Sequence, residues 1–205
     1  MVCKLLLATN NQAKVREYRS LLQNLPFELV TLAEQGISTV VAEVGESLEE
    51  NARLKATLLA AESRLLALAD DSGLEVDALD GEPGRLSARY AGEGASDKDR
   101  INYLLSKLNN VPWQRRSARF RCVITVATPG GKVEFCSGEC RGIITLEPKG
   151  GGGFGYDPVF YLPELDKTMA ELPLEVKNRI SHRGQAAGKV YQVLQKQPFA
   201  TFLNK

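Results

Sequence analysis

The chain has 205 residues, of which 43% are hydrophobic and 25% charged, and its formal net charge is +1 at pH 7. This composition is ordinary for a globular protein and excludes disordered and fibrous classes. The small net charge provides no global field for nucleic acid or an anionic membrane, so any phosphate must be recognised locally. No apolar run approaches the roughly 20 residues that span a bilayer, and residues 1–7 are too short for a signal peptide. We therefore expect a cytoplasmic protein without a nucleic-acid or membrane partner.

The cysteines and the histidine offer little material for a zinc site. Cys3, Cys122, Cys136 and Cys140 contain no Cys-x-x-Cys pair, and His182 is the only histidine. A disulfide is improbable in a cytosolic chain. We predict four free thiols in or near strands.

The first segment has the features of an anion site between a strand and a helix. Residues 4–9 are predicted as a strand and residues 13–22 as a helix with apolar residues at helical spacing. Between them, hydroxyl, amide and backbone N–H donors precede an ammonium one turn into the helix, which suits a phosphate chain. A capped helix with a solvated lysine is the simpler interpretation. The residues concerned are Thr9, Asn10, Asn11, Gln12, Ala13 and Lys14.

A second strand over residues 27–30 and a long helix over residues 47–64 follow. Ser47 to Glu50 has the form of a capping box. Lys55 then lies in the N-terminal half of this helix. Glu43 precedes the helix, so it is freer than Glu50 to bind a metal.

Asp70, Asp71, Ser72 and Gly73 come directly after an apolar run, residues 64–69, that is predicted as a buried strand. We expect the strand to end here and Gly73 to turn the chain sharply. Two adjacent acids at the mouth of a strand repel each other unless a cation lies beside them, so a bound divalent metal is the functional interpretation. An ordinary surface turn is the alternative, because all four residue types favour turns.

The middle of the chain combines a helix with strands. Residues 74–79 are predicted as a strand, and Ser96 caps a helix with a core-facing stripe. Residues 119–128 alternate like a half-buried strand, and residues 132–136 and 141–146 supply two more strands. An antiparallel insert in a strand–helix alternation predicts one α/β domain over residues 1–205. We expect a mixed, elongated, twisted sheet with flanking helices, forming two lobes around a central cleft.

The glycine-rich segment, residues 150–158, is the most unusual composition in the chain. Glycines let the backbone approach a flat ligand, and Phe154 and Tyr156 offer ring faces on which a base can stack. A flexible linker is the alternative, but linkers seldom carry two aromatics and an acid. Beyond it, Lys177 lies on a helix that begins at Pro173, and a last helix over residues 181–195 opens with Ser181, His182 and Arg183, a donor cluster for carbonyl or phosphate oxygens.

Six blocks, in this order along the chain, closely resemble the Ham1-like inosine triphosphate pyrophosphatases. They span residues 9–184 and read Thr9-Asn10-Asn11-x-x-Lys14, Glu50-Asn51-Ala52-x-Leu54-Lys55-Ala56, Ala69-Asp70-Asp71-Ser72-Gly73-Leu74, Ser87-Ala88-Arg89-Tyr90, Gly152-Gly153-Phe154-Gly155-Tyr156-Asp157-Pro158 and Ser181-His182-Arg183-Gly184. A single block is weak, whereas six in order make a chance match very improbable.

The resemblance implies a homodimeric cytoplasmic enzyme that uses Mg²⁺, or Mn²⁺ as a substitute, to hydrolyse dITP, ITP and XTP to the monophosphate and pyrophosphate. By the same resemblance Asp71 is the general base and a metal ligand, Glu43 is the other metal ligand, and Ser72 contacts the substrate. Residues 9–14 are assigned to the triphosphate, and Lys55 is assigned to substrate binding. The base and sugar site is assigned to Phe154, Gly155, Tyr156, Asp157, Lys177, His182 and Arg183.

Two positions depart from the family pattern. Family members often have Glu-Thr-Gly where this chain has Glu43-Val44-Gly45, which weakens the assignment of Glu43, and often a tyrosine at Leu86. The rival functions are a Maf-like or broad-specificity nucleoside triphosphate pyrophosphatase, and a regulator that binds a nucleotide without hydrolysing it. Adjacent acids argue against a pure binder, because they repel a triphosphate unless metal is present.

Overall fold

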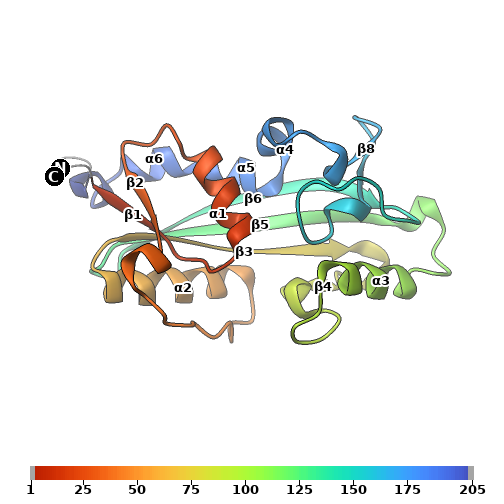
Figure 1. The fold of residues 1–205 in the computed structure, drawn as a ribbon, viewed down its shortest axis with the longest axis horizontal. Coiled ribbons are helices and arrows are strands. Elements are labelled where there is room, and N and C mark those ends of the chain that lie inside the picture. The colour runs from red at the N-terminus through yellow and green to blue at the C-terminus, as the bar shows by residue number, and fades with distance from the viewer. Residues whose placement is uncertain (1–2, 203–205) are drawn as a thin grey trace. The chain divides into compact units, whose positions relative to one another are not determined.

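Strands and helices form a mixed sheet flanked by helices in a computed structural model that describes residues 3–202 (Figure 1). This confirms the predicted α/β class. The chain divides into two compact units. The first combines the chain up to Asp71 with Cys122–Gly138 and the segment from Arg183, and the second comprises Ser72–Arg121 and Glu139–His182.

In the first unit the strand order is β2-β1-β3-β5-β6, and β1 pairs in parallel with both β2 and β3. Parallel strands buried on both faces read as continuous apolar runs, as in the fully buried Leu5, Leu6 and Leu7. The elements are β1 (Lys4–Leu7), α1 (Gln12–Leu21), β2 (Glu28–Thr31), α2 (Leu48–Ser63), β3 (Leu66–Val76), β5 (Ser117–Ala127), β6 (Val133–Ile144), α5 (His182–Ala187) and α6 (Val190–Leu194), of which β3, β5 and β6 continue into the second unit.

Helices cover both faces of the first unit's sheet (Figure 1). Alternate residues of a strand point to opposite faces. Leu5, Leu7 and Leu68 therefore pack with α1, α5 and α6, whereas Leu6 and Ala67 pack with α2.

The second unit contains antiparallel strand pairs and one apolar core. The strand order is β3-β5-β6-β7-β8, with β4 antiparallel to β3 and β7 antiparallel to both β6 and β8. Ile101, Leu104 and Leu108 lie in this core, which confirms the predicted stripe. The remaining elements are β4 (Pro83–Gly84), α3 (Asp97–Lys107), β7 (Phe160–Leu162), β8 (Lys167–Thr168) and α4 (Leu174–Ile180).

The expected turn at residues 70–73 is wrong, because β3 runs without interruption from Leu66 to Val76. Gly73 is needed for a close approach and not for a turn. A Cβ atom there would lie 2.3 Å from the carbonyl oxygen of Gly84 on β4. The separate strand expected over residues 74–79 is the end of β3, followed by a 3₁₀ turn.

Two other boundaries and one burial pattern differ from expectation. The two strands expected over residues 132–136 and 141–146 are replaced by one strand, β6 (Val133–Ile144). Polar residues between them stay in the strand, and Glu139 pairs with Arg119 and Arg141. The last helix is divided into α5 and α6 near Gly188, a residue type with low helix propensity. Strand β5 is half-buried only at its start, because residues 122–127 are buried on both faces.

The cysteines are free thiols, as predicted, and Cys122, Cys136 and Cys140 are buried. Within residues 3–202, no helix combines the length and hydropathy that a membrane span requires.

Candidate active site

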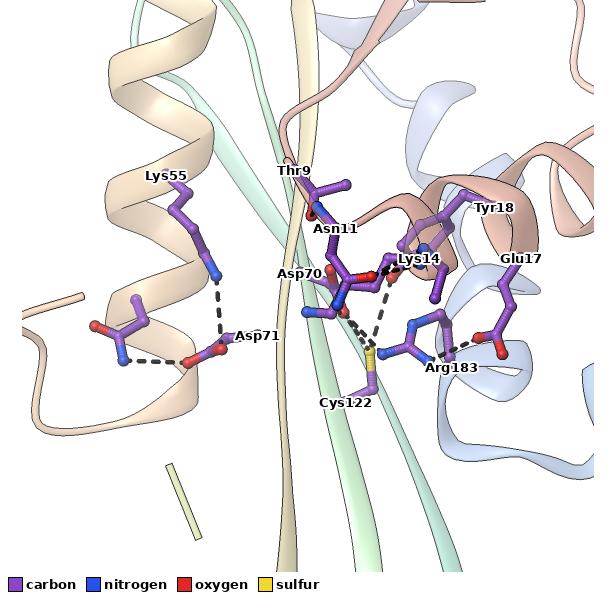
Figure 2. Close-up of polar contacts among 12 residues, drawn as sticks. Thr9, Asn11, Lys14, Glu17, Tyr18, Lys55, Asp70, Asp71, Cys122 and Arg183 are labelled. Atoms are coloured by element: carbon purple, nitrogen blue, oxygen red, sulfur yellow. Dashed lines mark hydrogen bonds and ion pairs between the residues drawn. The ribbon is translucent and has the colours of Figure 1, made fainter. Parts of the chain in front are cut away.

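Asp70 and Asp71 are neighbours in β3, so their side chains point to opposite faces of the first unit's sheet (Figure 2). Asp71 faces α2, and Asp70 faces α1. Both are buried, with 6% and 2% exposed surface respectively. Because each carboxylate has its own cationic partners, the repulsion expected from their adjacency is relieved separately on each face.

On the α2 face, Asp71 contacts an amide and an ammonium from the helix. Asn51 Nδ2 donates to Asp71 Oδ2 at 3.1 Å, and Lys55 Nζ lies 3.5 Å from Asp71 Oδ1. Lys55 Nζ is also 2.7 Å from Glu43 Oε1. The two acids assigned to a metal by resemblance therefore converge on one positive charge.

The burial of this face changes the protonation of its groups. Burial raises the pKa of Asp71 above its usual value, although Lys55 and Lys14 oppose the rise. Burial lowers the pKa of Lys55, but the neighbouring carboxylates, Asp71 foremost, outweigh it, and the net shift is upward. A carboxylate with a raised pKa is a better proton acceptor, and its protonated lysine neighbour keeps it ionised near neutral pH.

Asn51 is a functional candidate that was not predicted from the sequence. It is 1% exposed, and its side chain joins two segments because its Oδ1 accepts from Gly45 N at 2.8 Å while its Nδ2 binds Asp71. A polar side chain at a core-facing position of α2 was the available signal. Asn51 fixes both the orientation of Asp71 and the segment that carries Glu43.

On the α1 face, Asp70 lies at the centre of a buried ionic network (Figure 2). Its Oδ2 is 2.9 Å from Lys14 Nζ and 3.3 Å from Arg183 Nη2, and Arg183 Nη1 is 2.7 Å from Glu17 Oε2. Burial alone would raise the pKa of Asp70, but Lys14 and Arg183 outweigh it and hold that pKa well below its usual value. Asp70 therefore stays ionised near neutral pH and pairs with two cations.

This network locates Arg183, which the resemblance assigns to the base and sugar site. Arg183 is 1% exposed, and its guanidinium is bound to Glu17 and Asp70. The contacts support a role in holding Asp70, and through Asp70 the ammonium of Lys14.

The segment before α1 has the predicted strand–turn–helix form. Asn11 caps the helix, since its Oδ1 accepts from Ala13 N at 2.9 Å and from Lys14 N at 3.2 Å. Asn11 N donates to Thr9 Oγ1 at 3.2 Å. Asn10, Asn11 and Gln12 are exposed. The helix cap of the simpler interpretation is present, but its solvated lysine is wrong, because Lys14 is largely buried and paired with Asp70.

In the second unit, the glycine-rich segment is an ordered loop around a buried ion pair. Asp157 and Lys177 are each 3% exposed and bind each other, and Asp157 Oδ2 also accepts from Phe154 N at 2.9 Å. Lys177 Nζ lies 5.0 Å from the centre of the half-buried Phe154 ring. The geometry is not that of a flexible linker.

The other predicted residues of the second unit have different surroundings. Tyr156 is 4% exposed, belongs to the core, and donates its hydroxyl to Ser87 O. His182 is 4% exposed and stacks on Phe120 at 4.7 Å between ring centres. Gly155 and Ser72 are half-buried. Of the two loop aromatics, Phe154 is therefore the one with an accessible ring.

The fold is that of an α/β protein. Its ammonium groups beside a helix N-terminus are suited to bind phosphate. The Ham1 family profile matches residues 5–193, and the chain belongs to the Ham1 family.

Relatives and solved structures agree with this assignment. The dITP/XTP pyrophosphatase of Geobacter sulfurreducens is 52% identical over 89% of this chain and 92% of its own length. That of Desulforamulus reducens is 51% identical over 93% and 95%. A HAM1 protein from Coxiella burnetii superimposes with a TM-score of 0.85 at 40% identity, covering 94% of this chain and 98% of that one. The Ham1 protein of Staphylococcus aureus gives 0.83 at 42%, with the same coverage.

Proposed function

We propose that this Ham1-family chain is a nucleoside triphosphate pyrophosphatase that hydrolyses dITP, ITP and XTP to the monophosphate and pyrophosphate, and so cleanses the nucleotide pool. The observation that carries the proposal is the pairing of Asp71 with Glu43 on the ammonium of Lys55. Relatives about half identical to this chain are named dITP/XTP pyrophosphatases. Acids beside lysines suit a substrate whose phosphates must be neutralised before water attacks.

Asp71 is the proposed general base. Its raised pKa and its hydrogen bond from Asn51 support a role in orienting and deprotonating the water that attacks the α-phosphorus. Lys14 and Lys55 are the proposed counter-charges for the phosphates, together with the donors of residues 9–13.

The donor set of this corner fits Mg²⁺ or Mn²⁺. Carboxylate oxygens are the ligands that these ions prefer, and Mg²⁺ is commonly held by one or two carboxylates together with substrate phosphates. Glu43 and Asp71, which already share one cation, would hold it. When bound, such an ion neutralises phosphate charge and lowers the pKa of water.

We assign the base and sugar to residues 154–157, Lys177 and His182, and a further substrate contact to Ser72. Arg183, which the resemblance also places there, is bound to Glu17 and Asp70 and is proposed to hold Asp70. The half-buried ring of Phe154, with an ammonium beside it, supports stacking of an electron-poor purine. Hypoxanthine and xanthine present an acceptor at position 6 where adenine presents an amino donor. Donors of this set would face that amino group unpaired, at a cost of about 1–3 kcal/mol.

Product analysis in isotopically labelled water tests the reaction. The protein is incubated with ITP and Mg²⁺, and we expect IMP and pyrophosphate, with the label in IMP because water attacks the α-phosphorus. Asp71→Asn should lower kcat by roughly 10²–10⁴-fold if Asp71 is the base. IDP and phosphate as products would refute the α-phosphate assignment, and tight nucleotide binding without turnover would favour the binding regulator.

A substrate panel tests the specificity. We expect kcat/KM for ITP and XTP to exceed that for ATP, GTP and CTP. Equal rates on all five would support the broad-specificity alternative. A modified pyrimidine triphosphate is added to the panel, and faster hydrolysis of it than of ITP would support the Maf-like alternative.

The homodimer and the cytoplasmic location are also proposals. The four free thiols suit a reducing compartment such as the cytoplasm. Analytical ultracentrifugation tests the dimer, and a monomer across the micromolar range would contradict it.

A further inference from the structure

Two carboxylates hold consecutive backbone amides of the glycine-rich loop in the second unit. Asp157 Oδ2 accepts from Phe154 N at 2.9 Å, and Asp97 Oδ2 accepts from Gly155 N at 2.7 Å. Asp157 belongs to the loop, whereas Asp97 is the first residue of α3. The backbone amide of Gly155, which follows Phe154, is therefore hydrogen-bonded by a residue of α3, outside the loop.

The loop has little conformational freedom on either side of Phe154. Gly153 and Gly155 have φ angles of +69° and +63°, in the left-handed region that favours glycine. A Cβ atom at Gly153 would lie 2.0 Å from Asp157 Oδ2. Tyr156 donates its hydroxyl to the carbonyl oxygen of Ser87 at 2.9 Å. These contacts fix one backbone path, and the direction of the Phe154 side chain depends on that path.

Asp97 is itself held by Arg100, one turn along α3. The two side chains form an ion pair, and Arg100 Nη1 donates to the carbonyl oxygens of Ala88 and Ala95 at 2.7 Å each. Arg100 thereby joins the 3₁₀ turn Ser87–Arg89 to the start of α3. A charged acceptor makes a stronger hydrogen bond than a neutral one, so Asp97 is suited to restrain the loop.

We propose that Asp97 is a positioning residue for the purine base: through the Gly155 amide it holds the loop in the conformation that presents the Phe154 ring. This rests on the proposed function, because it takes the base to stack on Phe154. Loss of the Asp97 contact leaves the loop to be ordered by the substrate, and that ordering reduces affinity. The reacting phosphorus is assigned to Asp71 and not to this loop. Loss of the Asp97 contact should therefore raise KM and leave kcat nearly unchanged.

Three variants separate the contact from its surroundings. Asp97→Ala removes the acceptor and should raise KM for ITP roughly tenfold, with kcat changed less than about threefold. Asp97→Asn keeps an acceptor but loses the charge, so it should recover part of the affinity. Asp99→Ala is the matched control, because Asp99 caps the same helix through Ser96 without being bonded to Gly155. It should leave KM unchanged within about twofold.

Two further measurements keep a failure of this proposal apart from a failure of the proposed function. The first is a double-mutant cycle. In the Phe154→Ala background, Asp97→Ala should no longer raise KM, because the ring that Asp97 positions is absent. Amide hydrogen exchange over residues 153–157, without substrate, should be faster in Asp97→Ala than in the wild type or Asp99→Ala.

The outcomes then decide between the two. Unchanged exchange and unchanged KM in Asp97→Ala overturn the positioning role, and so does an equal rise in KM in Asp99→Ala. Faster exchange with no effect of Phe154→Ala on KM leaves the loop restraint intact but refutes the stacking assignment. Should Asp97→Ala fail to fold, Asp97→Asn is measured in its place, and normal exchange with an additive cycle overturns the proposal.

Discussion

Neutralising Asp70 and neutralising Asp71 should change the stability of the protein in opposite ways. Asp70→Asn leaves the buried Arg183 with Glu17 as its remaining acid partner and removes the partner of Lys14. Breaking a buried ion pair costs about 3–5 kcal/mol, and because Arg183 keeps one partner we expect the lower end, about 3 kcal/mol. Burial disfavours the charged form of Asp71, so Asp71→Asn should be neutral or stabilising.

The pH dependence follows from the directions of the two pKa shifts. Asp70 has a lowered pKa in the folded state, so its contribution is complete above its unfolded value of about 4 and is lost as pH falls below it. Asp71 has a raised pKa, so the fold is favoured below about pH 4 and loses stability as pH rises through the folded value. The destabilisation in Asp70→Asn should therefore shrink in acid, and any advantage of Asp71→Asn should vanish there.

Urea unfolding followed by circular dichroism, with chelator and without nucleotide, measures both variants against the wild type between about pH 3 and 8. Retained secondary structure at zero urea is the control for each variant. A loss below about 1 kcal/mol for Asp70→Asn, or equal destabilisation by the two substitutions, would refute the separation of the two carboxylates onto different partners.

Three further substitutions test other contacts. Gly73→Ala should destabilise by about 1–3 kcal/mol in urea unfolding, because its Cβ meets the Gly84 carbonyl; an unchanged midpoint would contradict that approach. Ser47→Ala should cost about 1 kcal/mol, since Ser47 Oγ caps α2 by accepting from Glu50 N, and a cost near zero would show that the cap contributes nothing. Arg183→Met should cost about 3–5 kcal/mol by leaving two buried acids together, and a thermal scan showing no loss would refute the network.

Local patterns were sufficient for most of the fold. The caps at Ser47 and Ser96 and the helical spacing of apolar residues placed α2 to within a residue or two and located the start of α3. The extent of β3 was missed because Asp70 to Gly73 are all turn formers by type, and pairing with neighbouring strands overrides that local preference. Strand pairing likewise makes the two strands expected within β6 a single strand.

The site was predictable in its residue types but not in its partners. The acids and lysines were identified from motifs, yet the sequence does not reveal that Arg183 folds back onto Asp70, because that contact joins positions far apart in the chain. For the same reason, the sequence placed Asn51 in a motif but did not predict its hydrogen bond to Asp71. Burial and long-range charge pairing decide these roles.

The opposite orientations of Asp70 and Asp71 also constrain how β3 can change length. Leu66 and Leu68 are aligned with Leu5 and Leu7 of β1, and that alignment sets which face each later side chain meets. Inserting or deleting one residue ahead of Asp70 would exchange the two environments, placing Asp70 beside Lys55 and Asp71 beside Arg183. Relatives should therefore tolerate length variation in surrounding loops but keep the spacing within this strand constant.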